Sequence, residues 1–270
     1  MTDEVPNEAE TQNNSRQGDT AVKEMVYRYT IFGRKKNVQE EAKFSSGFFP
    51  FVGVVTAAIT FLVTLIIFLI ADNLADASPF TAVMVLAIPL IIYRFRTTAG
   101  LMKLGDRMFP QGNGNIGPAG LMYPILIVLI IYGIYWMVGA PFMLICVPAL
   151  EIAVALSIVS MVYFSDVAKD QKFVACRDTP GLITATIISV IGIVAFSGVG
   201  LLIVDMLTVT NVILAVFSVV IALLIGYILA KVYDKKLKGL DNDLFWASFD
   251  ISRVLIGILF IIIAAIVLLM

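Results

Sequence analysis

The chain has no histidine, only two cysteines and few charges, and each shortage excludes a class of site. Without histidine there is no Ser-His or Cys-His catalytic pair, and the commonest zinc ligand is missing. A metal site would have to use oxygen ligands, which suit Mg²⁺ or Mn²⁺. Cys146 lies in an apolar run and Cys176 in a charged loop, with no Cys-x-x-Cys spacing, so we expect no disulfide between them.

Charged residues make up 14% of the 270 residues, whereas hydrophobic residues make up 60%. Soluble domains of this size are far more polar, and apolar runs long enough to cross a bilayer recur along this chain. We expect an all-α, polytopic membrane helix bundle in which residues 48–270 form a single transmembrane domain. About seven spans are predicted, at residues 48–70, 79–95, 121–140, 141–164, 181–207, 209–233 and 254–270.

The N-terminal part differs from the rest because it is polar. Residues 1–22 are rich in Glu, Asn, Gln, Thr and Ser without hydrophobic periodicity, which predicts a disordered cytoplasmic tail. The sequence has no basic segment followed by an apolar run and a cleavage site, so we expect no signal peptide. Residues 23–47 are amphipathic, with Arg34-Lys35-Lys36 at their centre, and are predicted to lie at the membrane interface.

Basic residues are distributed asymmetrically between the two sides of the membrane. All 19 Lys and Arg residues fall in the N-terminal part, in the loops after the second, fourth and sixth predicted spans or the last residues of those spans, or at the entry to the last span. The opposite side carries Asp72, Asp76 and Asp205 and no basic residue. The positive-inside rule therefore predicts a multi-pass protein of the cell (inner, cytoplasmic) membrane with its N-terminus in the cytoplasm and its C-terminus outside.

Two polar stretches interrupt the apolar chain, and both carry carboxylates. The first covers residues 97–106 and ends in Asp106; the second covers residues 238–243 and is followed by Asp250 and Arg253. Both are expected on the cytoplasmic side, where nucleotides and phosphorylated metabolites are found. Converging carboxylates hold Mg²⁺, and neighbouring Lys or Arg side chains neutralise phosphate. A solvated loop of mixed charge is the simpler interpretation of any one of these residues taken alone.

Spacing adds detail to these acidic residues. Asp243 and Asp250 are seven apart, which places them on one face of a helix, and Asp250 and Arg253 have the spacing of a local ion pair. Glu151 lies deep in the span predicted at 141–164, where a charge is costly. We expect Glu151 to be protonated, paired or turned toward a polar cavity.

Common nucleotide-binding and catalytic patterns are missing from the sequence. There is no Walker loop, no Rossmann fingerprint and no Asp-Gly-x2-Ala-Arg pattern of the CDP-alcohol phosphotransferases. The sequence has no basic patch interleaved with aromatic residues of the kind that binds nucleic acid, so nucleic acid is not an expected partner.

Four segments together carry a family resemblance. Residues 45–53 contain a Pro-x-x-Gly core, and residues 100–108 are similar to an acidic block His-x-Asp-Gly-Leu-x-Asp-x-x-Asp. Residues 116–120 are similar to the end of Asp-Ser-Arg-x-Gly-x-x-Gly, and residues 239–250 to Gly-Gly-x-Thr-Gly-Asp-x-x-Gly-Ala-x-x-Glu. On these segments, from about residue 28 onward, the chain resembles the cobalamin synthase family, the adenosylcobinamide-GDP ribazoletransferases.

The chain departs from the family pattern in its acidic centre. The family's His and first Asp fall on Thr97 and Ala99, its second Asp falls on Lys103, and Asp106 retains its third. In the last block Asp243 matches an Asp, Asp250 stands in place of a Glu, and Asp241-Asn242 replace Thr-Gly. The order, spacing and hydrophobic framing of the blocks agree with the family, while the carboxylates are fewer.

The resemblance implies a Mg²⁺-dependent transferase that joins adenosylcobinamide-GDP to α-ribazole, or its phosphate, and releases GMP. It implies Mg²⁺ ligands at Asp106, Asp243 and Asp250, catalytic roles for Asp106 and Asp243, and substrate contacts from Lys103, Arg107, Lys238 and Asp241. The lost His and Asp positions leave an alternative, a noncatalytic cobalamin-synthase-like membrane subunit or corrinoid-binding partner. A transporter ranks third, because Glu151 is the only ionisable residue deep in a predicted span.

The partners expected from the resemblance are adenosylcobinamide-GDP and α-ribazole. Membrane lipid surrounds the predicted spans, and association with a second copy or with other membrane proteins of the cobalamin pathway is compatible with the sequence.

Overall fold

The computed structural model of the chain describes residues 22–23, 25–32, 45–71, 77–110, 116–169, 173, 177–205 and 209–269. Its helices are α2 (Pro50–Ala71), α3 (Ser78–Ile92), α4 (Arg96–Met108), α5 (Pro118–Val138), α6 (Ala140–Phe164), α8 (Thr179–Ile203), α9 (Val209–Leu237) and α10 (Asn242–Leu269). Within the described ranges there is no strand, and the one β-type contact is an isolated parallel bridge between Ala168 and Leu240. The predicted all-α bundle is confirmed.

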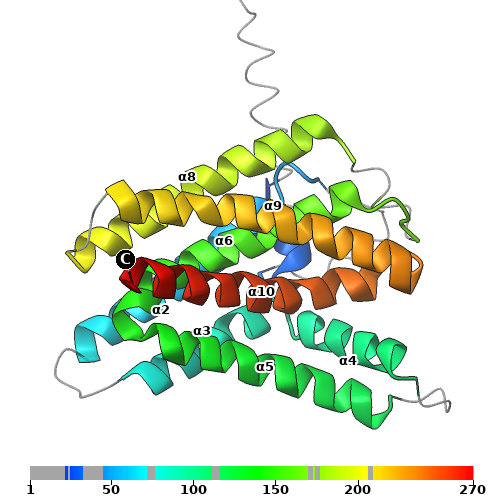
Figure 1. Cartoon of the computed structure of the whole chain (residues 1–270), viewed down its shortest axis with the longest axis horizontal. Coiled ribbons are helices and arrows are strands. Elements are labelled where there is room, and N and C mark those ends of the chain that lie inside the picture. Colours follow the sequence, from blue (N-terminus) through cyan, green and yellow to red (C-terminus); the bar gives the residue numbers. More distant parts are fainter. Residues whose placement is uncertain are drawn as a thin grey trace, which may run out of the picture.

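Helix α6 forms the centre of the bundle and packs against α2, α8, α9 and α10 (Figure 1). Every residue from Val147 to Val162 is buried. The sequence explains this position, because α6 is apolar on all sides and a helix without a polar face is stable only where other helices or lipid surround it. The surrounding helices expose large apolar side chains instead, as expected for surfaces in contact with lipid.

Six helices are long and apolar enough to cross a membrane, namely α2, α5, α6, α8, α9 and α10. A seventh crossing exists if α3 and α4, which meet at an angle of 86°, count as one broken span. Helix α3 alone has 15 residues, about 22 Å of helix, whereas a typical hydrocarbon core is about 30 Å thick. The prediction of a multi-pass membrane protein is confirmed.

The boundaries of two predicted segments differ from the sequence-based expectation. The last helix begins at Asn242, ahead of the membrane span predicted at 254–270, because Asp250 and Arg253 pair inside the protein and so do not end the apolar segment. The first polar stretch, expected in a loop, forms α4, whose Thr97, Gly100, Leu101, Leu104 and Gly105 are buried. Both segments form helices despite their charged residues, because the buried face of each helix contacts protein and not lipid.

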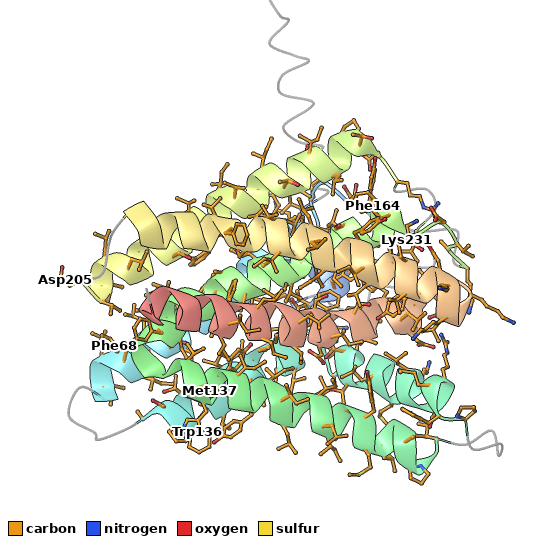
Figure 2. All side chains as sticks on the ribbon, in the orientation of Figure 1. Phe68, Trp136, Met137, Phe164, Asp205 and Lys231 are labelled. Atoms are coloured by element: carbon orange, nitrogen blue, oxygen red, sulfur yellow. The ribbon has the colours of Figure 1, made fainter. Side chains whose placement is uncertain are left out.

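The two ends of the bundle differ in charge. One end, called the polar end, holds the starts of α5, α8 and α10 and the ends of α6 and α9 (Figure 1). Figure 2 shows Lys231 toward this end and Asp205 at the opposite end. Apart from the buried Arg253, the described basic residues lie in the helical residues 22–23 and 25–29, in α4 and the link before it, in the end of α9 and in the links after α6 and α9. This distribution agrees with the charge asymmetry of the sequence.

Residues 25–29 are helical and pack against the polar end. The ring of Tyr29 lies 5.2 Å from that of Phe49 and 5.8 Å from those of Phe245 and Trp246, centroid to centroid. The described part of the predicted interfacial segment is thus anchored by an aromatic cluster at the starts of α2 and α10. Of the predicted disordered tail, residues 1–21 lie outside the described residues, and so do Arg34-Lys35-Lys36 and Cys176.

Candidate functional site

The two polar stretches lie against each other, because α4 packs directly on the first half of α10. Gly100 makes this close approach possible. A Cβ atom at Gly100 would lie 2.6 Å from the carbonyl oxygen of Asp243 and 2.6 Å from the amide nitrogen of Ala247. Gly105 lies as close to α5, since a Cβ atom there would lie 2.9 Å from the carbonyl oxygen of Ala119. The glycines of the first stretch therefore bring helices together.

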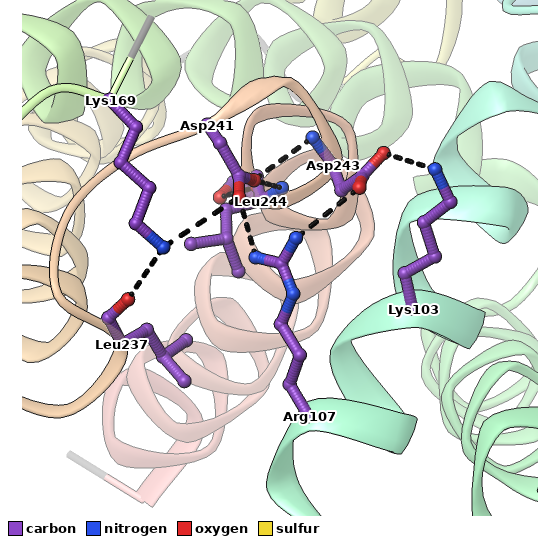
Figure 3. Close-up of polar contacts among 8 residues, drawn as sticks. Lys103, Arg107, Lys169, Leu237, Asp241, Asp243 and Leu244 are labelled. Atoms are coloured by element: carbon purple, nitrogen blue, oxygen red, sulfur yellow. Dashed lines mark hydrogen bonds and ion pairs between the residues drawn. The ribbon is translucent and has the colours of Figure 1, made fainter. Parts of the chain in front are cut away.

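An ionic network joins the two stretches at the surface (Figure 3). Lys103 Nζ lies 2.8 Å from Asp243 Oδ1, and Arg107 reaches Asp241 Oδ2 at 2.7 Å and Asp243 Oδ2 at 3.3 Å. Lys169, from the link after α6, lies 4.0 Å from Asp241 Oδ2. We call these five residues the α4–α10 charge network. The lysines are about half exposed, so each pair contributes at most about 1 kcal/mol, and salt weakens it.

Asp241 also starts α10, because its Oδ1 accepts hydrogen bonds from the amides of Asp243 (3.1 Å) and Leu244 (3.0 Å). The turn before it is tight: Lys238 has a φ of 57° and Gly239 a φ of 113°. A Cβ atom at Gly239 would meet the carbonyl oxygen of Val167 at 2.5 Å. Lys238 is exposed in this turn, beside the charge network in sequence.

Asp106 faces α5 and is not part of the network. Its Oδ1 accepts the amide hydrogens of Gly117 at 3.0 Å and Gly120 at 3.1 Å, so that it caps the start of α5. A Cβ atom at Gly120 would collide with the Asp106 carboxylate. The structure therefore gives Asp106 a clear local role in joining α4 to α5.

Asp250 lies in the bundle core, in a fully buried ionic cluster. Arg253 donates from Nε to Glu151 Oε1 at 2.7 Å and from Nη2 to Glu151 Oε2 at 2.9 Å, and its Nη1 donates to Asp250 Oδ1. The side chains of Glu151, Asp250 and Arg253 are at most 2% exposed. The expected local pair of Asp250 with Arg253 is confirmed, and so is the expectation that Glu151 is paired.

Hydroxyl groups from four further segments lie around the cluster. Tyr93, in the link between α3 and α4, shares a 3.0 Å hydrogen bond with Thr56 of α2. Thr97 of α4 faces Asp250, and Tyr135 of α5 faces Glu151. Three buried oxygens here have no hydrogen-bond partner: Thr97 Oγ1, the Tyr135 hydroxyl and Asp250 Oδ2. Such orphaned atoms are unusual in a folded core.

The remaining acidic residues of the polar end hold loops and helix ends. Asp178 caps α8 through the amide of Gly181 and accepts a 2.6 Å hydrogen bond from Ser46. Asp234 accepts from Ser165 and from the amides that follow α6. A hydrogen bond from Lys231, together with its charge, holds the pKa of the exposed Asp166 below its usual value. These contacts give Asp166, Asp178 and Asp234 structural roles at the polar end.

The three residues implied as Mg²⁺ ligands have different surroundings. Asp243 contacts two cationic side chains, Asp106 accepts two amide hydrogens, and Asp250 is buried in the ionic cluster. Among the described residues, no group of three or more acidic or cysteine side chains is arranged to hold a metal ion. As placed, Asp106, Asp243 and Asp250 therefore do not form one Mg²⁺ site.

Sequence reasoning missed two features of this region. Lys169 joins the charge network from a distant link, and no local pattern indicates that contact. The pairing of Glu151 with Arg253 spans 102 residues. Glu151 and Arg253 each stand out in the sequence as a charged residue in or beside a predicted span. The rule that a charge in a span needs an opposite partner could have found the pair.

Comparison with known proteins adds no relative: no family model matches the chain, and neither does any curated protein or any solved structure.

Proposed function

We propose that the chain is a membrane transferase that binds a nucleotide-activated substrate at the junction of α4 and α10. The substrate class suggested by the resemblance is adenosylcobinamide-GDP, with α-ribazole or its phosphate as acceptor and GMP as leaving group. The observation that carries the proposal is the direct packing of the two motif stretches, which are some 140 residues apart in sequence. Two separate blocks of one site need this proximity.

The charges of the junction suit a diphosphate group. Lys103, Arg107, Lys169 and Lys238 supply positive charge in a region next to the apolar bundle, and guanidinium and ammonium groups bind phosphate oxygens. Asp241 and Asp243 hold Lys103 and Arg107 in place before substrate binds. We assign substrate binding to these cations and assign to Asp243 the positioning of both Lys103 and Arg107. The implied catalytic role of Asp106 stays a prediction.

A noncatalytic, corrinoid-binding or membrane-subunit role is the second candidate, and a specific contact favours it. Lys103 occupies the place of a family carboxylate and binds Asp243. A carboxylate that already neutralises Lys103 and Arg107 is poorly available for a divalent cation. In this reading the junction retains the fold and the substrate contacts of the family but lacks its metal chemistry.

Complementation separates the two candidates. The full chain is expressed in a strain that lacks cobalamin synthase, and growth that depends on adenosylcobalamin is measured. The transferase proposal expects growth, and it expects Asp243→Ala to abolish growth while the protein remains in the membrane. The matched control is Asp166→Ala, which removes an exposed carboxylate of the same end outside the charge network.

Direct binding of GDP to the purified chain completes the test. If growth fails but GDP binds, and if Arg107→Ala weakens the binding at least tenfold, the noncatalytic role is supported. If the wild-type chain neither supports growth nor binds GDP, both candidates are wrong.

A further inference from the structure

The buried ionic cluster carries an unbalanced charge. Glu151 and Arg253 form a two-point pair through Nε and Nη2, which neutralises both groups. Asp250 adds a second carboxylate to the same guanidinium, so the three side chains together have a formal charge of −1. All three lie inside the part of α6 and α10 that is long and apolar enough to cross the membrane. A net charge in such surroundings is costly unless another positive charge balances it.

No other described charged side chain contacts Asp250. The ionisable groups that face the cluster are Tyr93 from the link between α3 and α4 and Tyr135 from α5, and neither carries positive charge. Helix α9 contributes Tyr233, which hydrogen-bonds to Ser248 instead. Of the cations of α4, Lys103 and Arg107 contact the start of α10 at Asp243. Arg96 lies over the ring of Trp246 and donates to the carbonyl oxygen of Arg28. Among the residues that the structure describes, no side chain therefore supplies the balancing charge.

Unpartnered oxygens mark where that charge is held. Asp250 Oδ1 accepts from Arg253, whereas Asp250 Oδ2 has no partner although it is fully buried. The hydroxyl of Thr97 faces this carboxylate from α4, and neither Thr97 Oγ1 nor Asp250 Oδ2 has a partner in good hydrogen-bond geometry. A proton on Oδ2 would become a donor to Thr97 Oγ1, and a small cation would be coordinated by the same two oxygens. Either occupant satisfies both atoms and removes the net charge.

We propose that the Glu151–Arg253–Asp250 cluster is a membrane-core site for one monovalent cation, either Na⁺ or a proton, held by Asp250 and Thr97. The site is independent of the phosphate-binding junction proposed above, because it uses the buried oxygens of the core and not the exposed cations of the polar end. It also gives Asp250 a ligand different from Mg²⁺: a single charge is enough to balance the cluster.

Thermal unfolding of the purified full chain in detergent tests the proposal. In the sodium arm, NaCl replaces choline chloride at constant ionic strength and pH, and the Tm rises with each tenfold increase in Na⁺ once the site fills. In the proton arm, without Na⁺, the Tm falls as the pH rises, because a proton bound only by the folded state is lost. One of these two responses is expected of the wild type.

Asp250→Asn removes the charge that needs balancing and keeps the shape of the side chain. It should abolish whichever response the wild type shows. Asp205→Asn, an exposed carboxylate at the opposite end of the bundle, is the matched control and should leave the response intact. The proposal is overturned if Asp250→Asn keeps the same sodium and pH dependence as the wild type, or if the wild type responds to neither.

A spectroscopic measurement on the wild type covers the case in which Asp250→Asn does not fold. Infrared difference spectra recorded with and without Na⁺ report the carbonyl stretch of a protonated carboxyl group. A proton site shows this band without Na⁺, and a sodium site shows a shift of the carboxylate bands when Na⁺ is added. The absence of both signals contradicts the proposal.

Discussion

At the scale of single residues, the most consequential side chain is Arg253. It is 2% exposed and holds two buried carboxylates from two helices. Replacing Arg253 with Met keeps much of the volume but leaves Glu151 and Asp250 facing each other without a counter-charge. Breaking a buried ion pair in this way costs about 3–5 kcal/mol. We expect Arg253→Met to lower the Tm strongly in detergent.

The triple variant Glu151→Gln, Asp250→Asn, Arg253→Met provides the control for that prediction. It removes all three charges, so no unpaired charge remains, and it should recover a large part of the lost Tm. A triple variant as unstable as Arg253→Met alone would mean that packing, and not charge, sets the effect.

Gly100 provides a second prediction at this scale. An alanine here would place its Cβ atom 2.6 Å from backbone atoms of α10, which have little freedom to move away. Gly100→Ala should therefore separate α4 from α10, lower the Tm and weaken GDP binding at the junction. Gly133→Ala is the matched control, since a Cβ atom at Gly133 has nothing within 4 Å. Equal Tm values for the two variants would contradict the close packing of α4 on α10.

At the scale of elements, the start of α8 depends on one carboxylate. Asp178 accepts a 2.8 Å hydrogen bond from the amide of Gly181 and a 2.6 Å hydrogen bond from Ser46, which precedes α2. Loss of a helix cap costs about 1 kcal/mol, and here the contact with Ser46 is lost as well. Asp178→Ala should thus lower the Tm more than Ser46→Ala does.

A double-mutant cycle measures this contact between the starts of α2 and α8. If Asp178 and Ser46 interact as described, the double variant loses less stability than the sum of the two single variants. Strict additivity would show that the hydrogen bond contributes nothing in the membrane protein.

The same cap position in α10 is filled by Asp241, so the capping of helices at the polar end accounts for part of its acidic content.

The sequence predicted elements better where apolar length alone decides them. Helices α2, α5, α6, α8 and α9 lie close to the predicted spans, because a run of about 20 apolar residues has few alternatives in lipid. The start of the last membrane span was predicted too late, at residue 254, since hydropathy treats Asp250 and Arg253 as exposed charges, whereas tertiary pairing buries them. Helix α4 was missed as a helix because its buried face is made of small and mixed residues such as Thr97 and Gly100.

At the scale of the whole molecule, the candidate site was predicted in part. The meeting of the two polar stretches followed from their motifs, but the division of their carboxylates did not. Asp243 joins a surface network, Asp106 caps a helix and Asp250 belongs to the core. These assignments depend on which helix each side chain faces, and a single sequence holds no information on that choice.

The orientation of the bundle links its charge asymmetry to the proposed substrates, and it can be measured directly. In a background with Cys146→Ser and Cys176→Ser, a single cysteine is placed at Asp205 or at Lys231, which lie toward opposite ends of the bundle (Figure 2). The positive-inside rule expects the end bearing Lys231 in the cytoplasm. A membrane-impermeant maleimide added to intact cells should label Asp205→Cys, and it should label Lys231→Cys only after permeabilisation. The reverse pattern would place the α4–α10 junction outside the cell, away from nucleotide-activated substrates, and the proposed transferase function would then be wrong.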